Sequence, residues 1–168
     1  MQKLYPNVTA LVPTRVSLLK AVTAEDLLIG AVLVAGQRAP TLVSESMVKK
    51  MAAGSVIIDI AVDQGGCIET IRPTDYGNPT YIEHDVLHFG VANMPGAVPR
   101  TSTYALNNAT LPFTLALADQ GPHDALLADA HFLGGLNICG GMLTEQHVAE
   151  AQGLAYVPPA EALAKVYA

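Results

Sequence analysis

The chain has 168 residues, of which 51% are apolar and only 14% are charged, and its formal net charge is −6. This length suits one domain of ordinary size, and the apolar fraction excludes an intrinsically disordered protein. The negative charge argues against nucleic acid and anionic membranes as partners. Because so much of the chain is apolar, we expect some apolar surface to meet a partner, in an oligomer or against a further domain.

The two cysteines and the five histidines do not form a metal-binding pattern. Cys67 and Cys139 lie far apart without a ligand spacing, so we expect neither a zinc site nor a disulfide, and a reducing cytoplasmic location. His84 and His88 are four apart on an extended pattern, which excludes helical metal-ligand geometry. No signal peptide core and no apolar run of about 18 residues occurs, so we expect no membrane span.

Apolar runs typical of buried strands alternate with short helical patterns in the first half of the chain. The predicted strands are residues 8–12 (VTALV), 27–34 (LLIGAVLV), 55–62 (SVIIDIAV) and 86–92 (VLHFGVA). The predicted helices are residues 17–23 and 45–51, and residues 67–85 form a long surface excursion with one extended piece at 80–83. This order predicts an α/β fold with a parallel sheet of about four strands.

The second half of the chain has a helical pattern. Residues 101–118 predict a long helix that Gly121 and Pro122 interrupt, and shorter helices follow at 124–131, 144–152 and 159–167. Residues 134–141 (GGLNICGG) have neither the GxGxxG spacing nor a preceding strand, so we expect a linker there. We expect one domain over residues 1–100 and a helical segment over residues 101–168.

Polar side chains follow two neighbouring strands of the predicted sheet. Asp63 comes directly after residues 55–62, and Asn93 after residues 86–92. Ligands of open α/β sheets bind outside the carboxyl ends of the strands, so we expect both side chains at one functional edge; the alternative is that each only forms a turn. Gly30 indicates a close approach by either a ligand or a packed helix.

Three segments resemble the second half of alanine dehydrogenase, the NAD-dependent enzyme that interconverts L-alanine with pyruvate and ammonium. They are EDLLIGAVLV, MVKKMAAGSVIIDIAVDQGGCIETIRPT and VANMPGAVPRTSTYALNNATLP, and the resemblance runs from about residue 14 to the C-terminus. It implies a partial Rossmann-like NAD-binding domain, followed by C-terminal helices that pack back on the catalytic domain. The NAD-binding subunit of proton-translocating transhydrogenase shares this layout but differs in the DQGG and ANMPGAVP segments.

The resemblance also implies roles for individual residues. It makes Asp63 a catalytic acid/base or electrostatic partner, and it places Asn93 near the substrate. A carboxylate can stabilise a cationic imine or move protons during alanine oxidation, and an amide can orient substrate without adding charge. Arg72 would meet a cofactor phosphate or, alternatively, a surface carboxylate. The implied NAD-binding residues are Val32, Leu33, Ile60, Ala61, Val62, Asp63, Arg72, Val91, Ala92, Asn93 and Met94.

The family's N-terminal half has no counterpart in this sequence. The resemblance places there the arginine and lysine that contact substrate, the catalytic histidine and the Gly-rich turn that binds pyrophosphate. Two hypotheses follow. The chain is either part of an alanine dehydrogenase, with L-alanine and pyruvate as ligands and a homo-oligomer or a complementing N-terminal half as partner, or a catalytically silent α/β interaction module. A third and weaker alternative is that the chain is a fragment of a transhydrogenase subunit.

Overall fold

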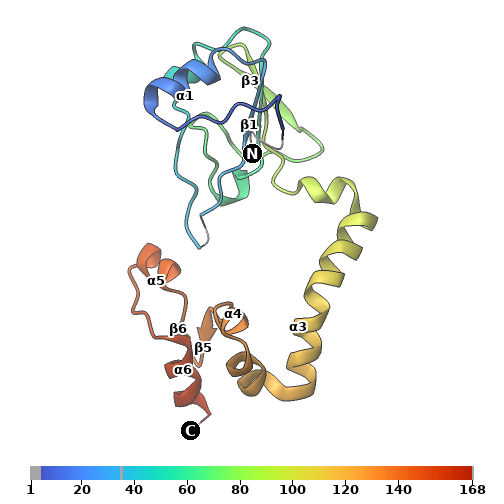
Figure 1. Ribbon diagram of the computed structural model, residues 1–168, viewed down its shortest axis with the longest axis vertical. Coiled ribbons are helices and arrows are strands. Elements are labelled where there is room, and N and C mark those ends of the chain that lie inside the picture. The colour runs from blue at the N-terminus through green and yellow to red at the C-terminus, as the bar shows by residue number, and fades with distance from the viewer. Residues whose placement is uncertain (1–4, 35, 168) are drawn as a thin grey trace. The chain divides into compact units, whose positions relative to one another are not determined.

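The computed structural model describes residues 5–34 and 36–167, which form two compact units (Figure 1). Unit 1 contains residues 5–34 and 38–94, and unit 2 contains residues 36–37 and 95–167. Unit 1 holds the larger sheet and unit 2 holds most of the helical residues.

The sheet of unit 1 has four strands in the order β1-β2-β4-β3. They are β1 (Leu27–Gly30), β2 (Val56–Asp59), β3 (Thr80–Glu83) and β4 (Val86–Phe89). β1, β2 and β4 run parallel, and β3 pairs antiparallel with β4. The predicted α/β class with a mostly parallel sheet of four strands is therefore confirmed, although one strand runs the other way.

The prediction of a strand at residues 8–12 was wrong. This segment has no strand pairing, and the side chains of Leu11 and Val12 are 60% and 79% exposed. The fourth strand is instead β3, which reaches β4 through a two-residue turn. A hairpin needs only a short loop to bring its strands together, whereas residues 8–12 would need a neighbouring strand that the described chain does not offer them.

The parallel strands are shorter than predicted. As a result, β2 and β4 end several residues before Asp63 and Asn93, which were expected to follow them directly. β1 stops at Gly30 rather than at Val34, β2 at Asp59 rather than at Val62, and β4 at Phe89 rather than at Ala92. The candidate site residues therefore lie in the loops beyond the carboxyl ends of the strands.

One face of the sheet is covered by α1 (Arg15–Val22) and α2 (Glu45–Val48). Thr14 caps α1 by accepting a hydrogen bond from the Ser17 amide, while the Ser17 hydroxyl accepts from the Thr14 amide. The core beneath these helices joins Val22, Val48, Ile57, Ile68 and Val86, each at most 4% exposed.

The turn between β3 and β4 offers a stabilising substitution. His84 and Asp85 both have positive φ, 54° and 61°, as a type I′ turn requires. Glycine adopts these angles without steric cost, so Asp85→Gly is expected to raise the free energy of unfolding by about 0.5–1 kcal/mol. Urea unfolding of the two proteins measures this difference, and a lower stability of the variant would contradict the turn assignment.

Unit 2 is built from helices and one small hairpin. Its elements are α3 (Pro99–Ala128), α4 (Ala130–Leu133), β5 (Ile138–Cys139), β6 (Met142–Leu143), α5 (Gln146–Gln152) and α6 (Pro159–Val166). Leu126, Cys139, Ala162 and Leu163 form its buried core. Across residues 5–34 and 36–167, no helix combines the length and the apolar character that a membrane span requires.

Two predictions for unit 2 need correction, and one is confirmed. Residues 134–141 are not only a linker: they contain β5, which pairs with β6 through Gly140 and Gly141, at φ 54° and 78°. The predicted helix at residues 124–131 is divided at Asp129, whose carboxylate caps α4. The interruption at Gly121 is confirmed, because α3 is non-helical there, with φ 76° and ψ 162°.

Candidate functional site

A buried carboxylate shapes the turn that follows β2. Asp59, the last residue of β2, is 0% exposed. Its Oδ1 accepts a hydrogen bond of 2.9 Å from the Ala61 amide, and its Oδ2 accepts one of 2.8 Å from the Cys67 amide. Asp59 therefore holds both ends of residues 61–67, the turn that contains the DQGG segment.

Asp63 lies in the turn that the Asp59 carboxylate holds in place. The sequence predicted that Asp63 directly follows a strand; instead it lies in the short 3-10 helix η1 (Val62–Gln64), four residues beyond the end of β2, and is exposed. The chain leaves the strand early because the Asp59 carboxylate accepts from the amide two residues ahead, which bends the backbone. Gly65 and Gly66, at φ 96° and 71°, then turn the chain back.

Gly30 lies against Asp59 and Cys67 rather than against a helix. A Cβ at Gly30 would lie 2.7 Å from the Cys67 Sγ and 3.0 Å from the Asp59 Cγ. The close approach predicted at Gly30 is present, but the packed-helix alternative is corrected: the glycine makes room for a buried carboxylate and a buried thiol. Burial and the neighbouring Asp59 raise the pKa of the Cys67 thiol, so this thiol is an inert packing group.

A pocket of about 190 Å³ lies where the loops after β1 and β2 meet. It is lined by Ala31, Val32, Leu33, Ile60, Ala61 and Gln64. The Ile60 amide donates to the Gly30 carbonyl over 2.7 Å, so the two loops are held together. The structure thus brings four of the residues predicted from sequence, Val32, Leu33, Ile60 and Ala61, into one mostly apolar concavity, which Gln64 of η1 also lines.

The segment after β4 is held in place by contacts with the surface loop of residues 67–85. Thr74 forms a bridge with Val91, which is buried, and the Thr74 amide donates to the Gly90 carbonyl over 2.8 Å. The Tyr76 hydroxyl donates a hydrogen bond of 2.7 Å to the carbonyl of Met94. Ala92 and Asn93 lie exposed between these two anchors, and β4 is the direct parallel neighbour of β2.

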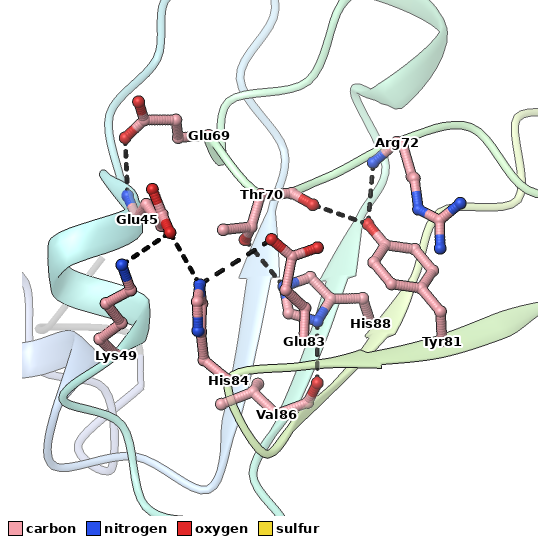
Figure 2. A network of polar contacts seen from close by, with 10 residues as sticks. All are labelled: Glu45, Lys49, Glu69, Thr70, Arg72, Tyr81, Glu83, His84, Val86 and His88. Atoms are coloured by element: carbon pink, nitrogen blue, oxygen red, sulfur yellow. Dashed lines mark hydrogen bonds and ion pairs between the residues drawn. The ribbon is translucent and has the colours of Figure 1, made fainter.

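The guanidinium of Arg72 lies over the ring of Tyr81, a residue of β3 (Figure 2). Its guanidinium carbon is 4.1 Å from the ring centroid, which is a cation–π geometry. The Tyr81 hydroxyl donates to the Thr70 carbonyl and accepts from the Arg72 amide, at 2.8 and 2.9 Å. The side chain of Arg72 is exposed, and the structure pairs it with an aromatic ring rather than with the surface carboxylate that was its alternative role.

His88 is the buried centre of this network. Its ring is 0% exposed and stacks on Tyr81 at 5.0 Å between centroids. Because the Val86 carbonyl can only accept, Nδ1 carries the proton and donates to it over 2.9 Å; the neutral Nε2 then accepts from the Thr70 hydroxyl over 2.8 Å. Burial lowers the pKa of His88 below its ordinary value, so the imidazole is neutral in the fold.

This burial predicts an acid sensitivity. A histidine held neutral in the fold takes up a proton more readily once unfolded, so stability falls as the pH drops below about 6.5, the ordinary histidine value. Urea unfolding at pH 7.5 and 5.5 is therefore expected to show a larger loss for the wild type than for His88→Gln, whose amide does not titrate. Equal losses in the two proteins would show that other groups cause the acid sensitivity.

A second set of contacts joins α2 to the β3–β4 turn, as Figure 2 shows. The Glu45 carboxylate lies 2.9 Å from the His84 Nε2 and 2.8 Å from the Lys49 ammonium. These two partners lower the pKa of Glu45. No group of three or more His, Cys, Asp or Glu side chains within the described residues is arranged to hold a metal ion.

Comparison with known proteins identifies the family. The family described as "Alanine dehydrogenase/PNT, C-terminal domain" matches residues 2–146. The chain belongs to this family. Curated alanine dehydrogenases from Halomonas elongata and Bacillus subtilis are 57% and 49% identical to it, over 84% and 94% of this chain. The chain spans about two fifths of each of these relatives, 38% and 42% of their lengths.

Two solved structures show that this chain is more similar to alanine dehydrogenase than to transhydrogenase. A structure of L-alanine dehydrogenase superposes with a TM-score of 0.77 at 48% identity, over 90% of this chain and 42% of the other. A transhydrogenase from Sinorhizobium meliloti superposes with a TM-score of 0.53 at 28% identity, over 61% of this chain and 30% of the other. The resemblance to alanine dehydrogenase stated from the sequence is confirmed, and transhydrogenase is the more distant relative of these two.

Sequence reasoning missed several residues that shape the site. Asp59 supports the turn that carries Asp63, Tyr76 holds Met94, and Tyr81 lies under Arg72. Asp59 had a signal, because it is a lone carboxylate within an apolar strand. The two tyrosines lie in a polar loop and on an edge strand, where no sequence pattern distinguishes them from surface residues.

Proposed function

We propose that this chain is the part of an NAD-dependent alanine dehydrogenase that holds NAD beside L-alanine. The observation that carries this proposal is the pocket formed by two loops beyond the carboxyl ends of adjacent parallel strands, with a third loop following the next parallel strand. The loops after β1 and β2 form the apolar pocket, and Asp63 and Asn93 are exposed beyond β2 and β4. This is the edge at which open α/β sheets bind their ligands.

The residues of this edge fit a dinucleotide in part. Val32, Leu33 and Ile60 offer an apolar wall for the flat face of a ring, and Arg72 offers an exposed positive charge that suits phosphate. Among the described residues, no Gly-rich turn joins a strand to a helix, so these residues offer no such binding site for the pyrophosphate. We therefore expect the isolated chain to bind NAD weakly.

The chemistry assigns separate tasks to Asp63 and Asn93. L-alanine, NAD⁺ and water give pyruvate, ammonium, NADH and a proton, and bound NAD⁺ supplies the acceptor for the hydride that leaves the alanine α-carbon. The Asp63 carboxylate stabilises the positive charge on the substrate nitrogen and accepts or returns a proton while water adds to the imine carbon. The Asn93 amide orients the substrate without altering the charge.

Calorimetric titration with NAD tests this proposal on the chain as it is. We expect saturable but weak binding, reduced by Asp63→Ala and by Asn93→Ala. The matched control is Asp26→Ala, because Asp26 is an exposed aspartate at the opposite end of β1. An affinity that neither site variant changes would contradict the assignment of this edge.

We further infer that the protein works in the cytoplasm and as an oligomer. Both cysteines are free and buried, which supports a reducing location. Large apolar side chains are exposed along α3, including Tyr104, Leu106 and Leu115 at 65%, 66% and 51%, which supports contact with a partner. We also expect no alanine-dependent NADH formation by the purified chain alone, because the arginine and lysine that contact substrate and the catalytic histidine that the resemblance implies have no counterpart in it.

A further inference from the structure

Arg72 carries an exposed positive charge that no carboxylate of the described chain neutralises. Its side chain is exposed, and among residues 5–34 and 36–167 it takes part in no ion pair. The guanidinium lies over the ring of Tyr81 instead. An arginine without a carboxylate partner keeps its planar set of N–H donors available for an anion, and phosphate matches the geometry of that set.

The backbone of Arg72 is fixed beside the loop that follows β4. The Arg72 carbonyl lies so close to Gly90 that a Cβ on this glycine would collide with it. The Thr74 amide donates to the Gly90 carbonyl over 2.8 Å, and Thr74 forms a bridge with Val91. Arg72 therefore lies next to the chain that leads into Asn93, at the edge to which the proposed function assigns NAD.

Tyr81 holds both the backbone and the guanidinium of Arg72, as Figure 2 shows. Its hydroxyl accepts from the Arg72 amide over 2.9 Å and donates to the Thr70 carbonyl over 2.8 Å, while its ring lies 4.1 Å from the guanidinium carbon. Burial raises the pKa of Tyr81, so the hydroxyl stays protonated and keeps its donor role at neutral pH. An exposed arginine otherwise samples many rotamers, and the ring restricts this freedom before an anion binds.

The ring of Tyr81 is itself held by the core of the sheet. Tyr81 and His88 are direct partners in the pairing of β3 with β4, and their rings stack at 5.0 Å with an angle of 17° between their planes. His88 is fully buried, and its Nε2 accepts from the Thr70 hydroxyl over 2.8 Å. The support under Arg72 is therefore a fixed part of the fold.

We propose that Tyr81 is a positioning residue of the NAD site, which holds the Arg72 guanidinium ready for a phosphate group of the cofactor. The inference rests on the proposed function, because it requires NAD at this edge. Tyr81 acts through Arg72 and does not need to touch NAD. A purely structural tyrosine would affect NAD binding only through the stability of the fold, and this difference can be measured.

A double-mutant cycle on NAD affinity tests the proposal, with dissociation constants from NMR titrations of the chain. We expect Arg72→Ala to weaken NAD binding about tenfold or more, because it removes a charged donor from the phosphate. Tyr81→Leu is expected to weaken binding about three- to fivefold through loss of the ring, and Tyr81→Phe, which keeps the ring, should weaken it less. Combined with Arg72→Ala, Tyr81→Leu should have no further effect.

Salt dependence separates positioning from a general effect on the fold. Salt screens a contact between an exposed charge and a phosphate, so NAD affinity should fall with rising salt in the wild type, and less steeply in Arg72→Ala and Tyr81→Leu. The matched control is Tyr104→Leu, since Tyr104 is 65% exposed on α3 of unit 2. Its affinity and salt dependence should equal those of the wild type. Circular dichroism verifies that each variant folds.

The side-chain Nε–H signal of Arg72 gives a readout that needs no variant. NAD should shift this signal in the wild type, and adenosine, which has no phosphate, should not. A signal that NAD leaves unmoved, or an equal loss from Tyr81→Leu with and without Arg72, would overturn the proposal. If Asp63→Ala and Asn93→Ala weaken NAD binding but Arg72→Ala and Tyr81→Leu do not, this proposal alone fails. Absence of any NAD binding by the wild type would overturn the proposed function with it.

Discussion

Replacing Asp59 by alanine is expected to lower the free energy of unfolding of unit 1 by about 3 kcal/mol. The substitution would leave the amides of Ala61 and Cys67 buried without their carboxylate acceptor, and each such unsatisfied donor costs about 1–3 kcal/mol. Urea unfolding followed by circular dichroism measures the loss.

Asp75 provides the matched control for this prediction. Its carboxylate also accepts from two backbone amides, those of Gly77 and Asn78 at 2.8 and 2.9 Å, but it does so in an exposed turn. Water can replace these bonds, so Asp75→Ala should cost about 1 kcal/mol or less. If the two alanine variants were equally stable, burial of the Asp59 carboxylate would not be what holds the turn.

Replacing Asp63 by asparagine is expected to reduce catalysis by about 100-fold or more in the complex with the N-terminal part of a relative. Asparagine keeps the size of the side chain but removes the negative charge and the proton acceptor, and general acid–base groups typically contribute about 10²–10⁴-fold. Alanine-dependent NADH formation measures the rate. Because Asp63 is exposed in η1, the variant should retain the stability of the wild type.

Asp26→Asn is the control for this second prediction. Asp26 is exposed at the amino end of β1, at the other edge of the sheet, and its substitution should leave the rate unchanged. A complex with Asp63→Asn that retained full activity would remove Asp63 from the chemistry, even if the two polypeptides still associated.

The pattern of apolar runs was enough to predict most of the sheet. Three of the four predicted strands contain β1, β2 and β4, because a continuous apolar run without polar alternation is typical of strands buried in a parallel sheet. The same criterion failed at residues 8–12, since an apolar run reports suitability for a strand but not whether a neighbouring strand exists. The extended piece at residues 80–83 was seen, but its pairing partner was not.

The position of the candidate site could be predicted from the sequence, but the contacts that support its residues could not. Placing Asp63 and Asn93 beyond adjacent strands needed only strand order and the rule for ligand sites in α/β sheets. The support by Asp59, Tyr76 and Tyr81 depends on hydrogen bonds between segments far apart in the sequence, such as the 18-residue separation of Tyr76 and Met94. Such contacts depend on the folded path of a long loop, which has no local sequence signal.

The small hairpin of unit 2 shows how a local signal can be misread. Gly140 and Gly141 are the two-residue turn between β5 and β6, with apolar residues on both sides. A pair of glycines flanked by apolar residues is a hairpin signal, but the same segment lacks a phosphate-binding spacing and a preceding strand, which favoured a linker.

We expect NAD to contact the loops after β1, β2 and β4 of this chain. The most direct test is an NMR titration of the isotope-labelled chain with NAD, which detects weak binding residue by residue. The largest amide shifts are expected on Val32, Leu33, Ile60 to Asp63, and Val91 to Met94, with small shifts in unit 2. Saturable shifts confined to other residues, or no shifts at millimolar NAD, would contradict it.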